Sequence, residues 1–330
     1  MARNTSIHNG ERIRWIDSLR GICILSILLD HTELYYTGIN IIDYNVYVVN
    51  ALVLFFILSG YLMYKEEGFD IKKKLKSIIK SLLLPYFLFS ILLSFPKALV
   101  HGNNIEVENI LLQIISGQSS WFVAALCTSE FIFALTVWIT HGKIIALSII
   151  GILGFGISIY LSKGNQPYIW QLDNSMQALL FLCMGYIYHR YEKVFNTIYR
   201  ASYTFLLFLL LIIIKVYEHM NGVNMLIWYI SINNYPVFLI DIFICSIFMI
   251  QLCKMLPPCR WLEWTGSHSL VYYFLCGGVP LLTSQTFEKI NWTYNGNYLL
   301  VLTAFLCVYI ITTILTWVIY KYLPFIIGKI

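Results

Sequence analysis

One stretch near the start of the chain places charged side chains in an otherwise apolar helical segment: 14-RWIDSLRGICILSILLDH-31. Within it, Arg20 and His31 stand eleven residues apart. Eleven residues are close to three helical turns, so both side chains share one face, roughly 16 Å apart along the axis. If the helix crosses a membrane, each ionisable group costs at least about 2.5–3.5 kcal/mol to insert, and such groups indicate a functional site.

Three polar residues of this segment lie on one stripe of the helix. Spacings of three and four residues join Asp17, Arg20, Ile24, Leu28 and His31. Taken singly, Arg14 and Arg20 are typical of interface anchors, and His31 is typical of a satisfied interior histidine. Their gathering on one stripe favours a functional site. Gly21 costs about 1 kcal/mol in a helix interior, which indicates close approach of another backbone or of a ligand.

The composition places the whole chain in a bilayer. The 330 residues are 59% hydrophobic and only 12% charged, with a mean hydropathy of +0.72. A soluble domain carries about 25% charged residues. Apolar stretches recur along the full length and leave no room for a sizeable soluble unit. We therefore predict an all-α integral membrane protein with a single membrane domain over 1–330 and no appended soluble domain.

A membrane-spanning helix needs about 20 predominantly apolar residues. By that measure about ten transmembrane helices are predicted, over 18–36, 46–64, 78–100, 119–140, 143–161, 174–191, 201–218, 235–256, 268–285 and 298–321. The fourth and fifth meet at a tight turn, 141–143. Two further apolar segments, 105–116 and 223–231, are too short to span and are typical of interfacial or re-entrant pieces.

The lysines and arginines predict the orientation. With a cytoplasmic N-terminus, 17 of the 22 basic residues fall on the inside and four on the outside, with Arg20 inside the first span. The positive-inside rule then puts both termini in the cytoplasm, as an even number of spans requires. No cleavable signal peptide is evident. The net charge of +5 reflects this bias and does not indicate nucleic-acid binding.

The residues of the first segment resemble a known signature. The run from Arg14 to Gly21, followed by His31, is similar to the N-terminal motif of the acyltransferase-3 family, in which ten residues separate an arginine from a histidine. Collinear resemblances follow along nearly the whole chain: FFILSGY at 55–61, the basic stretch 72–80 before Pro85-Tyr86, Trp121-Phe122 with Leu126 and Glu130, 179–186, and Gly266 with Ser269, Leu270 and Tyr273. Many members have a histidine where this chain has Cys276.

The resemblance implies a multi-spanning acyltransferase of the bacterial cytoplasmic (inner) membrane that O-acetylates a cell-envelope glycan. Acetyl-CoA would be the donor substrate, with no permanently bound cofactor, and a glycan or lipid-linked sugar would be the acceptor. Membrane lipids surround such a protein, and a separate glycan-assembly protein is a possible partner. The eight cysteines have no metal-ligand spacing, so no metal is predicted.

Catalytic roles fall to two residues. A histidine titrates near neutrality, so His31 suits a general base for the acceptor hydroxyl, or a nucleophile that takes the acyl group transiently. Glu130 is expected to orient His31 or an arginine, with a purely structural hydrogen bond as the alternative.

The remaining candidates are expected to bind the donor or line its site. Arginine forks suit phosphate, and two lysines four residues apart share a face. The set comprises Arg14, Asp17, Arg20, Lys76, Lys80, Trp121 and Ser269. Anionic lipid headgroups are the alternative partner for the lysine run, and packing is the alternative for Trp121.

Two other functions compete with the acyltransferase. A transporter or flippase of lipid-linked sugars would also have about ten spans and buried charges, but such folds often show internal repeats, and no convincing repeat is found here. A non-catalytic partner in glycan assembly is supported only by Cys276. Consumption of a thioester distinguishes the enzyme from both.

Overall fold

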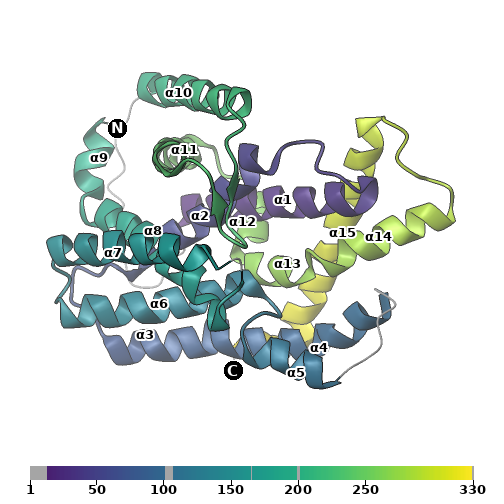
Figure 1. Ribbon diagram of the computed structural model, residues 1–330, viewed down its shortest axis with the longest axis horizontal. Helices are drawn as coiled ribbons and strands as arrows, with labels where there is room; N and C mark the ends of the chain where they lie inside the picture. Colours follow the sequence, from purple (N-terminus) through teal and green to yellow (C-terminus); the bar gives the residue numbers. More distant parts are fainter. Residues whose placement is uncertain (1–12, 101–106, 165, 199–200, 329–330) are drawn as a thin grey trace.

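The computed structural model describes residues 13–100, 107–164, 166–198 and 201–328 (Figure 1). Four of the basic residues used for the orientation, Arg3, Arg12, Arg200 and Lys329, lie outside these ranges. The elements follow in this order: α1 (Arg14–Thr37), α2 (Tyr44–Met63), α3 (Ile71–Ile78), η1 (Ile79–Leu83), α4 (Leu84–Val100), α5 (Val107–Ile115), α6 (Trp121–Ile139), α7 (Ile144–Ser162), η2 (Ile169–Gln171), α8 (Leu172–Arg190), α9 (Glu192–Ile198), α10 (Ala201–Met220), β1 (Met225–Leu226), β2 (Ser231–Ile232), α11 (Tyr235–Met255), α12 (Arg260–Ser267), α13 (Ser269–Leu275), α14 (Gly278–Lys289), α15 (Tyr298–Tyr322) and η3 (Pro324–Ile327).

Seven helical stretches in the described residues are long and apolar enough to cross a membrane: Tyr44–Met63, Ile71–Ser94, Trp121–Ile139, Ile144–Ser162, Ala201–Met220, Tyr235–Met255 and Tyr298–Tyr322. The protein is therefore an all-α, multi-pass membrane protein. Helices also form over the predicted spans 18–36 and 174–191, as α1 and α8, but their charged and polar residues keep them out of this set.

The predicted span over 268–285 is not one helix. It is divided between α13 and α14, and α12 ends directly before it at Ser267. The break between α13 and α14 falls at Cys276-Gly277, with Pro280 three residues further on. Glycine lowers helix propensity and proline cannot donate an i→i−4 hydrogen bond, so continuity is lost here. Broken helices are tolerated at membrane depth where protein surrounds them.

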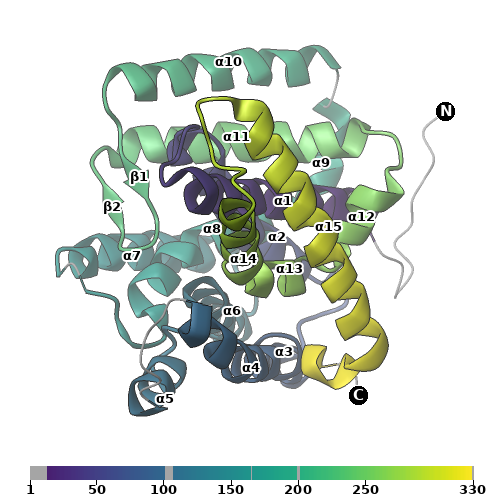
Figure 2. The same cartoon turned by 90° about the vertical axis from the view of Figure 1, so that its right-hand side faces the viewer.

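The helices form three groups that both cartoon views separate. Helices α10 and α11 lie on one side, α3, α4 and α6 lie on the other, and α1, α2, α8 and α12 lie between them (Figures 1 and 2). The apolar core follows this central group, with Leu19, Ile24 and Leu28 of α1 fully buried. Four polar residues of α1, Ser18, Asp30, Thr32 and Glu33, are thus buried in the interior of the bundle.

Loops predicted on the same side of the membrane lie together. At one end, Arg190 Nη1 donates to the Gly142 carbonyl at 3.1 Å, and Lys193 Nζ lies 3.5 Å from Glu66 Oε1. At the other end, Tyr36 of α1 donates to the Trp292 carbonyl in the loop before α15, and Asn45 of α2 bonds to Val223 and Met225 at the start of the β1–β2 hairpin. The tight turn at 141–143 is confirmed: His141 and Gly142 both have positive φ, 51° and 67°. The assignment of the first end to the cytoplasm remains a prediction.

Helices α1 and α12 touch through their backbones. A Cβ atom added to Gly266 would lie 1.7 Å from the Asp17 carbonyl oxygen, and one added to Gly21 would lie 2.4 Å from the Leu262 carbonyl oxygen. Only glycine fits at such a crossing. From the sequence, either another backbone or a ligand was expected close to Gly21, and the structure shows a backbone there.

Candidate functional site

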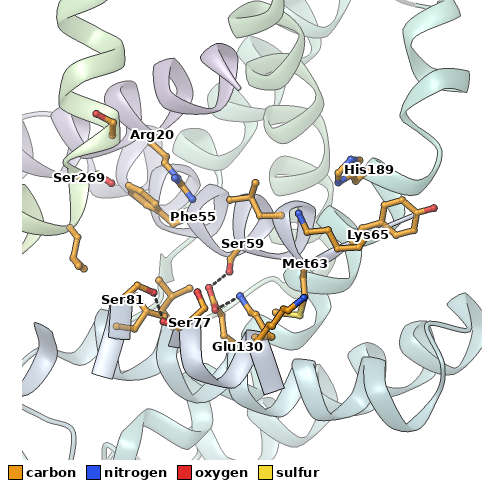
Figure 3. A pocket seen from close by; sticks show the side chains of 18 of the residues that line it. Arg20, Phe55, Ser59, Met63, Lys65, Ser77, Ser81, Glu130, His189 and Ser269 are labelled. Carbon is orange, nitrogen blue, oxygen red and sulfur yellow. Dashed lines mark hydrogen bonds and ion pairs between the residues drawn. The ribbon is translucent and has the colours of Figure 1, made fainter. Parts of the chain in front are cut away.

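A cavity of about 1320 Å³ opens at the end of the bundle that carries the α2–α3 loop (Figure 3). Its walls come from α1, α2, α3, η1, α6, α8, α9, α12, α13, α15 and η3. The exposed loop residues Lys65, Glu66 and Glu67 line its mouth. Along α2 the lining continues inward through Ser59 to Phe55, so Phe55 marks the inner part.

Two predicted donor-binding residues line this cavity, Arg20 from α1 and Ser269 from α13. Both lie close to the α1–α12 crossing, and Gly266 lines the wall as well. Figure 3 shows Arg20 and Ser269 on the same side of the cavity, opposite Ser77 and Ser81 of the α3–η1 segment. An arginine fork and a hydroxyl are thus brought together from segments about 250 residues apart.

Glu130 of α6 also lines the cavity, where it joins three helices. Its Oε2 lies 2.6 Å from Lys74 Nζ of α3, and its Oε1 accepts a hydrogen bond from Ser59 Oγ of α2. The side chains are largely buried, with 20% of Lys74 and 11% of Glu130 exposed. Glu130 therefore holds α2, α3 and α6 together. Its contacts with Ser59 and Lys74 agree with the structural hydrogen bond that was the alternative to orienting His31 or an arginine.

The inner part of the cavity is aromatic. Phe122 lies between Phe55 and Tyr273, with ring centroids 5.7 and 5.2 Å apart, and its backbone N–H donates to the Tyr273 hydroxyl at 3.3 Å. The mouth, in contrast, is charged. Asp70 caps α3 by accepting from the backbone N–H of Lys73, and this hydrogen bond holds the pKa of Asp70 below its ordinary value.

His31 lies apart from this cavity. It does not belong to the described residues that line it, and eleven residues of α1 separate it from Arg20, roughly 16 Å along the axis. Its Nδ1 is buried with no hydrogen-bond partner among the described residues, and its ring stacks on Tyr35 at 6.3 Å. Its neighbour Asp30 accepts a hydrogen bond from the Asn40 side chain. Glu33 accepts hydrogen bonds from the backbone N–H of Ile42 and from the Tyr298 hydroxyl.

Five other predicted residues are not among the described residues that line the cavity. Arg14 pairs with Glu263 of α12 at 3.2 Å, and 58% of its side chain is exposed. Asp17 packs its backbone against Gly266. Lys76 and Lys80 are exposed on the outer side of α3 and η1. Trp121 stacks on Trp228 of the hairpin loop at 6.1 Å.

Several residues of the cavity were missed from sequence. Ser59 stands within the FFILSGY motif and Lys73 and Lys74 within the basic stretch, so a signal existed for these three. The lysines of α3 that face the cavity are determined by how this helix packs against α6, which residue spacing does not predict. His189 carried no sequence signal.

The fold and the cavity together define a multi-pass membrane protein with a large pocket lined by charged side chains of both signs. A family model described as an acyltransferase domain, of the acyltransferase-3 type, matches residues 13–321 of 330. The chain belongs to this family and is an acyltransferase. Searches among curated proteins and among solved structures found no match.

Proposed function

We propose that this acyltransferase moves an acetyl group from cytoplasmic acetyl-CoA to a hydroxyl of a cell-envelope glycan or related acceptor in the bacterial inner membrane. The observation that carries the proposal is the arrangement of α1: Arg20 lines an open, charged cavity, and His31 stands on the same helix about three turns deeper. The same helix thereby carries both a residue of the proposed donor site, Arg20, and an imidazole that can accept or donate a proton, His31.

The cavity suits the donor in size and polarity. Its volume of about 1320 Å³ exceeds the range of about 300–1,000 Å³ that is usual for small-molecule pockets, and coenzyme A is a large ligand. The guanidinium of Arg20 is a bidentate partner for a phosphate. The aromatic inner part, around Phe55, Phe122 and Tyr273, suits the less polar pantetheine arm.

His31 supplies the chemistry in this proposal. As a general base it accepts the proton of the acceptor hydroxyl while the oxygen attacks the thioester carbonyl. The carbon–sulfur bond then breaks, and the thiolate leaves with a proton returned from the imidazole. As a nucleophile it would first form an acyl-imidazole, which the acceptor hydroxyl then attacks. The buried Nδ1 without a partner leaves this side chain free to take either role.

The acceptor would approach from the end of the bundle opposite the cavity mouth. The pantetheine arm would extend along the bundle interior to bring the thioester to His31, so that donor and acceptor meet within the membrane. A transporter of lipid-linked sugars is less well supported, because the chain belongs to an acyltransferase family.

The test uses purified protein in lipid vesicles with acetyl-labelled CoA and a crude envelope glycan fraction. Release of free thiol that disappears in His31→Ala and Arg20→Ala supports the proposal. Label retained on the wild-type protein favours the acyl-imidazole route. If the wild type neither binds nor consumes acetyl-CoA with acceptor present, the transporter or partner function becomes the better account.

A further inference from the structure

His189, at the end of α8, has a fixed orientation at the cavity mouth (Figure 3). Its Nδ1 lies 2.6 Å from the Tyr61 carbonyl oxygen. A carbonyl oxygen only accepts, so Nδ1 carries the hydrogen and Nε2 is the nitrogen that gains or loses a proton. The ring stacks on Tyr61 at 3.9 Å and 8°, and meets Tyr64 edge-on at 5.1 Å.

The Nε2 of His189 is available for a ligand. It has no hydrogen-bond partner among the described residues, although His189 lines the cavity. In the neutral ring it accepts a hydrogen bond, and in the protonated ring it donates one and carries charge. The chemistry proposed for His31 makes no use of it.

Two lysines near His189 are also available. Lys65 makes no ion pair within the part of the chain that the structure describes. Lys193 pairs with Glu66 at 3.5 Å, but 92% and 72% of these side chains are exposed, so solvent screens the pair. Lys65, Glu66 and Glu192 all lie close enough to interact electrostatically with His189. A dianion can therefore replace Glu66 on Lys193 and gain Lys65 as a second partner.

We infer that His189, Lys65 and Lys193 form a subsite for the 3′-phosphate of the donor's adenosine, and that the bound phosphate holds a proton on His189 Nε2. The inference rests on the proposed function. Coenzyme A carries a diphosphate between its pantetheine arm and its adenosine, and a separate phosphate on the ribose. With the arm directed inward, the diphosphate lies nearer Arg20, and the ribose phosphate lies nearest the mouth, where these three residues are.

The protonation of His189 Nε2 is explained by the negative charge of the bound phosphate. A phosphate dianion beside Nε2 favours the protonated form of the imidazole. The hydrogen bond from Nε2 to phosphate is then charge-assisted, which makes it about twice as strong as a neutral one. The subsite would distinguish coenzyme A from a donor that lacks the 3′-phosphate.

The experiment compares binding of acetyl-CoA and acetyl-3′-dephospho-CoA to the full-length protein in nanodiscs by isothermal titration calorimetry. The wild type is expected to bind acetyl-CoA at least about tenfold more tightly. His189→Asn and Lys65→Ala are each expected to reduce this preference to a few-fold. As the pH rises and His189 loses its proton, the wild-type preference is expected to fall relative to that of the His189→Asn protein.

Matched controls lie on the same end of the molecule. His141→Asn changes an exposed histidine whose positive φ suits asparagine, and Lys72→Ala removes an exposed lysine of α3; neither lines the described cavity. Both controls should keep the preference. Lys65 lies in an exposed loop, so Lys65→Ala is expected to fold like the wild type. The test therefore does not depend on His189→Asn alone.

Two results would overturn the subsite. The first is equal affinity of the wild type for acetyl-CoA and acetyl-3′-dephospho-CoA. The second is an unchanged preference for acetyl-CoA in both His189→Asn and Lys65→Ala. If thiol release still depends on His31 in those cases, the proposed function stands without the subsite. If the wild type binds neither donor, the subsite and the proposed function fail together.

Discussion

Lys74 Nζ lies 2.6 Å from Glu130 Oε2, and this ion pair joins α3 to α6 across the wall of the cavity. Ser59 of α2 donates to the other oxygen of the same carboxylate. Ile78 of the amphipathic α3 is buried, and Ile71 and Leu75 pack partly buried against the same apolar cluster, so the ion pair acts together with these contacts in holding α3 against the bundle. The shape of the cavity mouth thus depends on a polar contact between two residues 56 positions apart.

Removing one partner of this pair should destabilise the protein more than removing both. Lys74→Met leaves the Glu130 carboxylate largely buried without its cation, and Glu130→Gln leaves the ammonium without its anion. A double-mutant cycle is expected to give a coupling energy of about 1–3 kcal/mol. Thermal unfolding of the four proteins in one detergent measures it. Strictly additive losses would show that the pair is not coupled.

His31→Ala should strongly reduce thiol release without weakening donor binding. The loss of a general base or nucleophile lowers the rate by about 10²-fold or more, whereas His31 lies apart from the described cavity lining that would hold the donor. Thiol release and calorimetric affinity for CoA, measured on the same preparation, separate the two effects. An affinity that falls in parallel with the rate would place His31 in donor binding.

Arg20→Lys should weaken donor binding although it keeps the charge, because a lysine cannot form the two parallel hydrogen bonds of a guanidinium. The expected loss is about 1.5–3 kcal/mol of binding free energy. Arg14→Ala serves as the matched comparison: its pair with Glu263 is mostly exposed and lies outside the described lining, so it should change binding and stability by less than about 1 kcal/mol. A larger effect from Arg14 would place the donor at the start of α1.

Gly266→Ala should disrupt both the fold and the site. The added methyl group meets the Asp17 carbonyl oxygen at 1.7 Å, so α12 has to move away from α1 and carry the cavity wall with it. Overpacking of this kind costs about 1–3 kcal/mol or more. Gly277→Ala is the control, since an added Cβ there has no described heavy atom within 4 Å. The melting temperatures of the two variants should differ clearly; equal values would mean that the α1–α12 crossing yields easily.

Hydropathy and residue spacing were sufficient for much of this fold. They located most of the long helices, the tight turn at 141–143, and a close approach of a backbone or a ligand at Gly21, because each depends on local sequence. The division of 268–285 was missed because Gly277-Gly278 lowers helix propensity without reducing hydropathy. Hydropathy does not report whether an apolar segment is one helix or two.

The candidate site was predictable only in part. Arg20, Glu130 and Ser269 reach the cavity because their motifs stand on helices that form its walls. Lys76 and Lys80 were preferred for their i,i+4 spacing, but that spacing only shows that two residues share a face. Which face turns inward is decided by the contact between Lys74 and Glu130, a tertiary interaction between distant segments.

The crossing of α1 and α12 also bears on the entropy of ligand binding. Because the contact joins backbone to backbone at Gly21 and Gly266, no side-chain rotamer can loosen it. The Cα of Arg20 is thereby held in place before any ligand arrives. The binding of an anion near Arg20 therefore requires no reordering of the two helices, and the entropic cost falls on side chains alone, about 0.5–1.5 kcal/mol for each one immobilised.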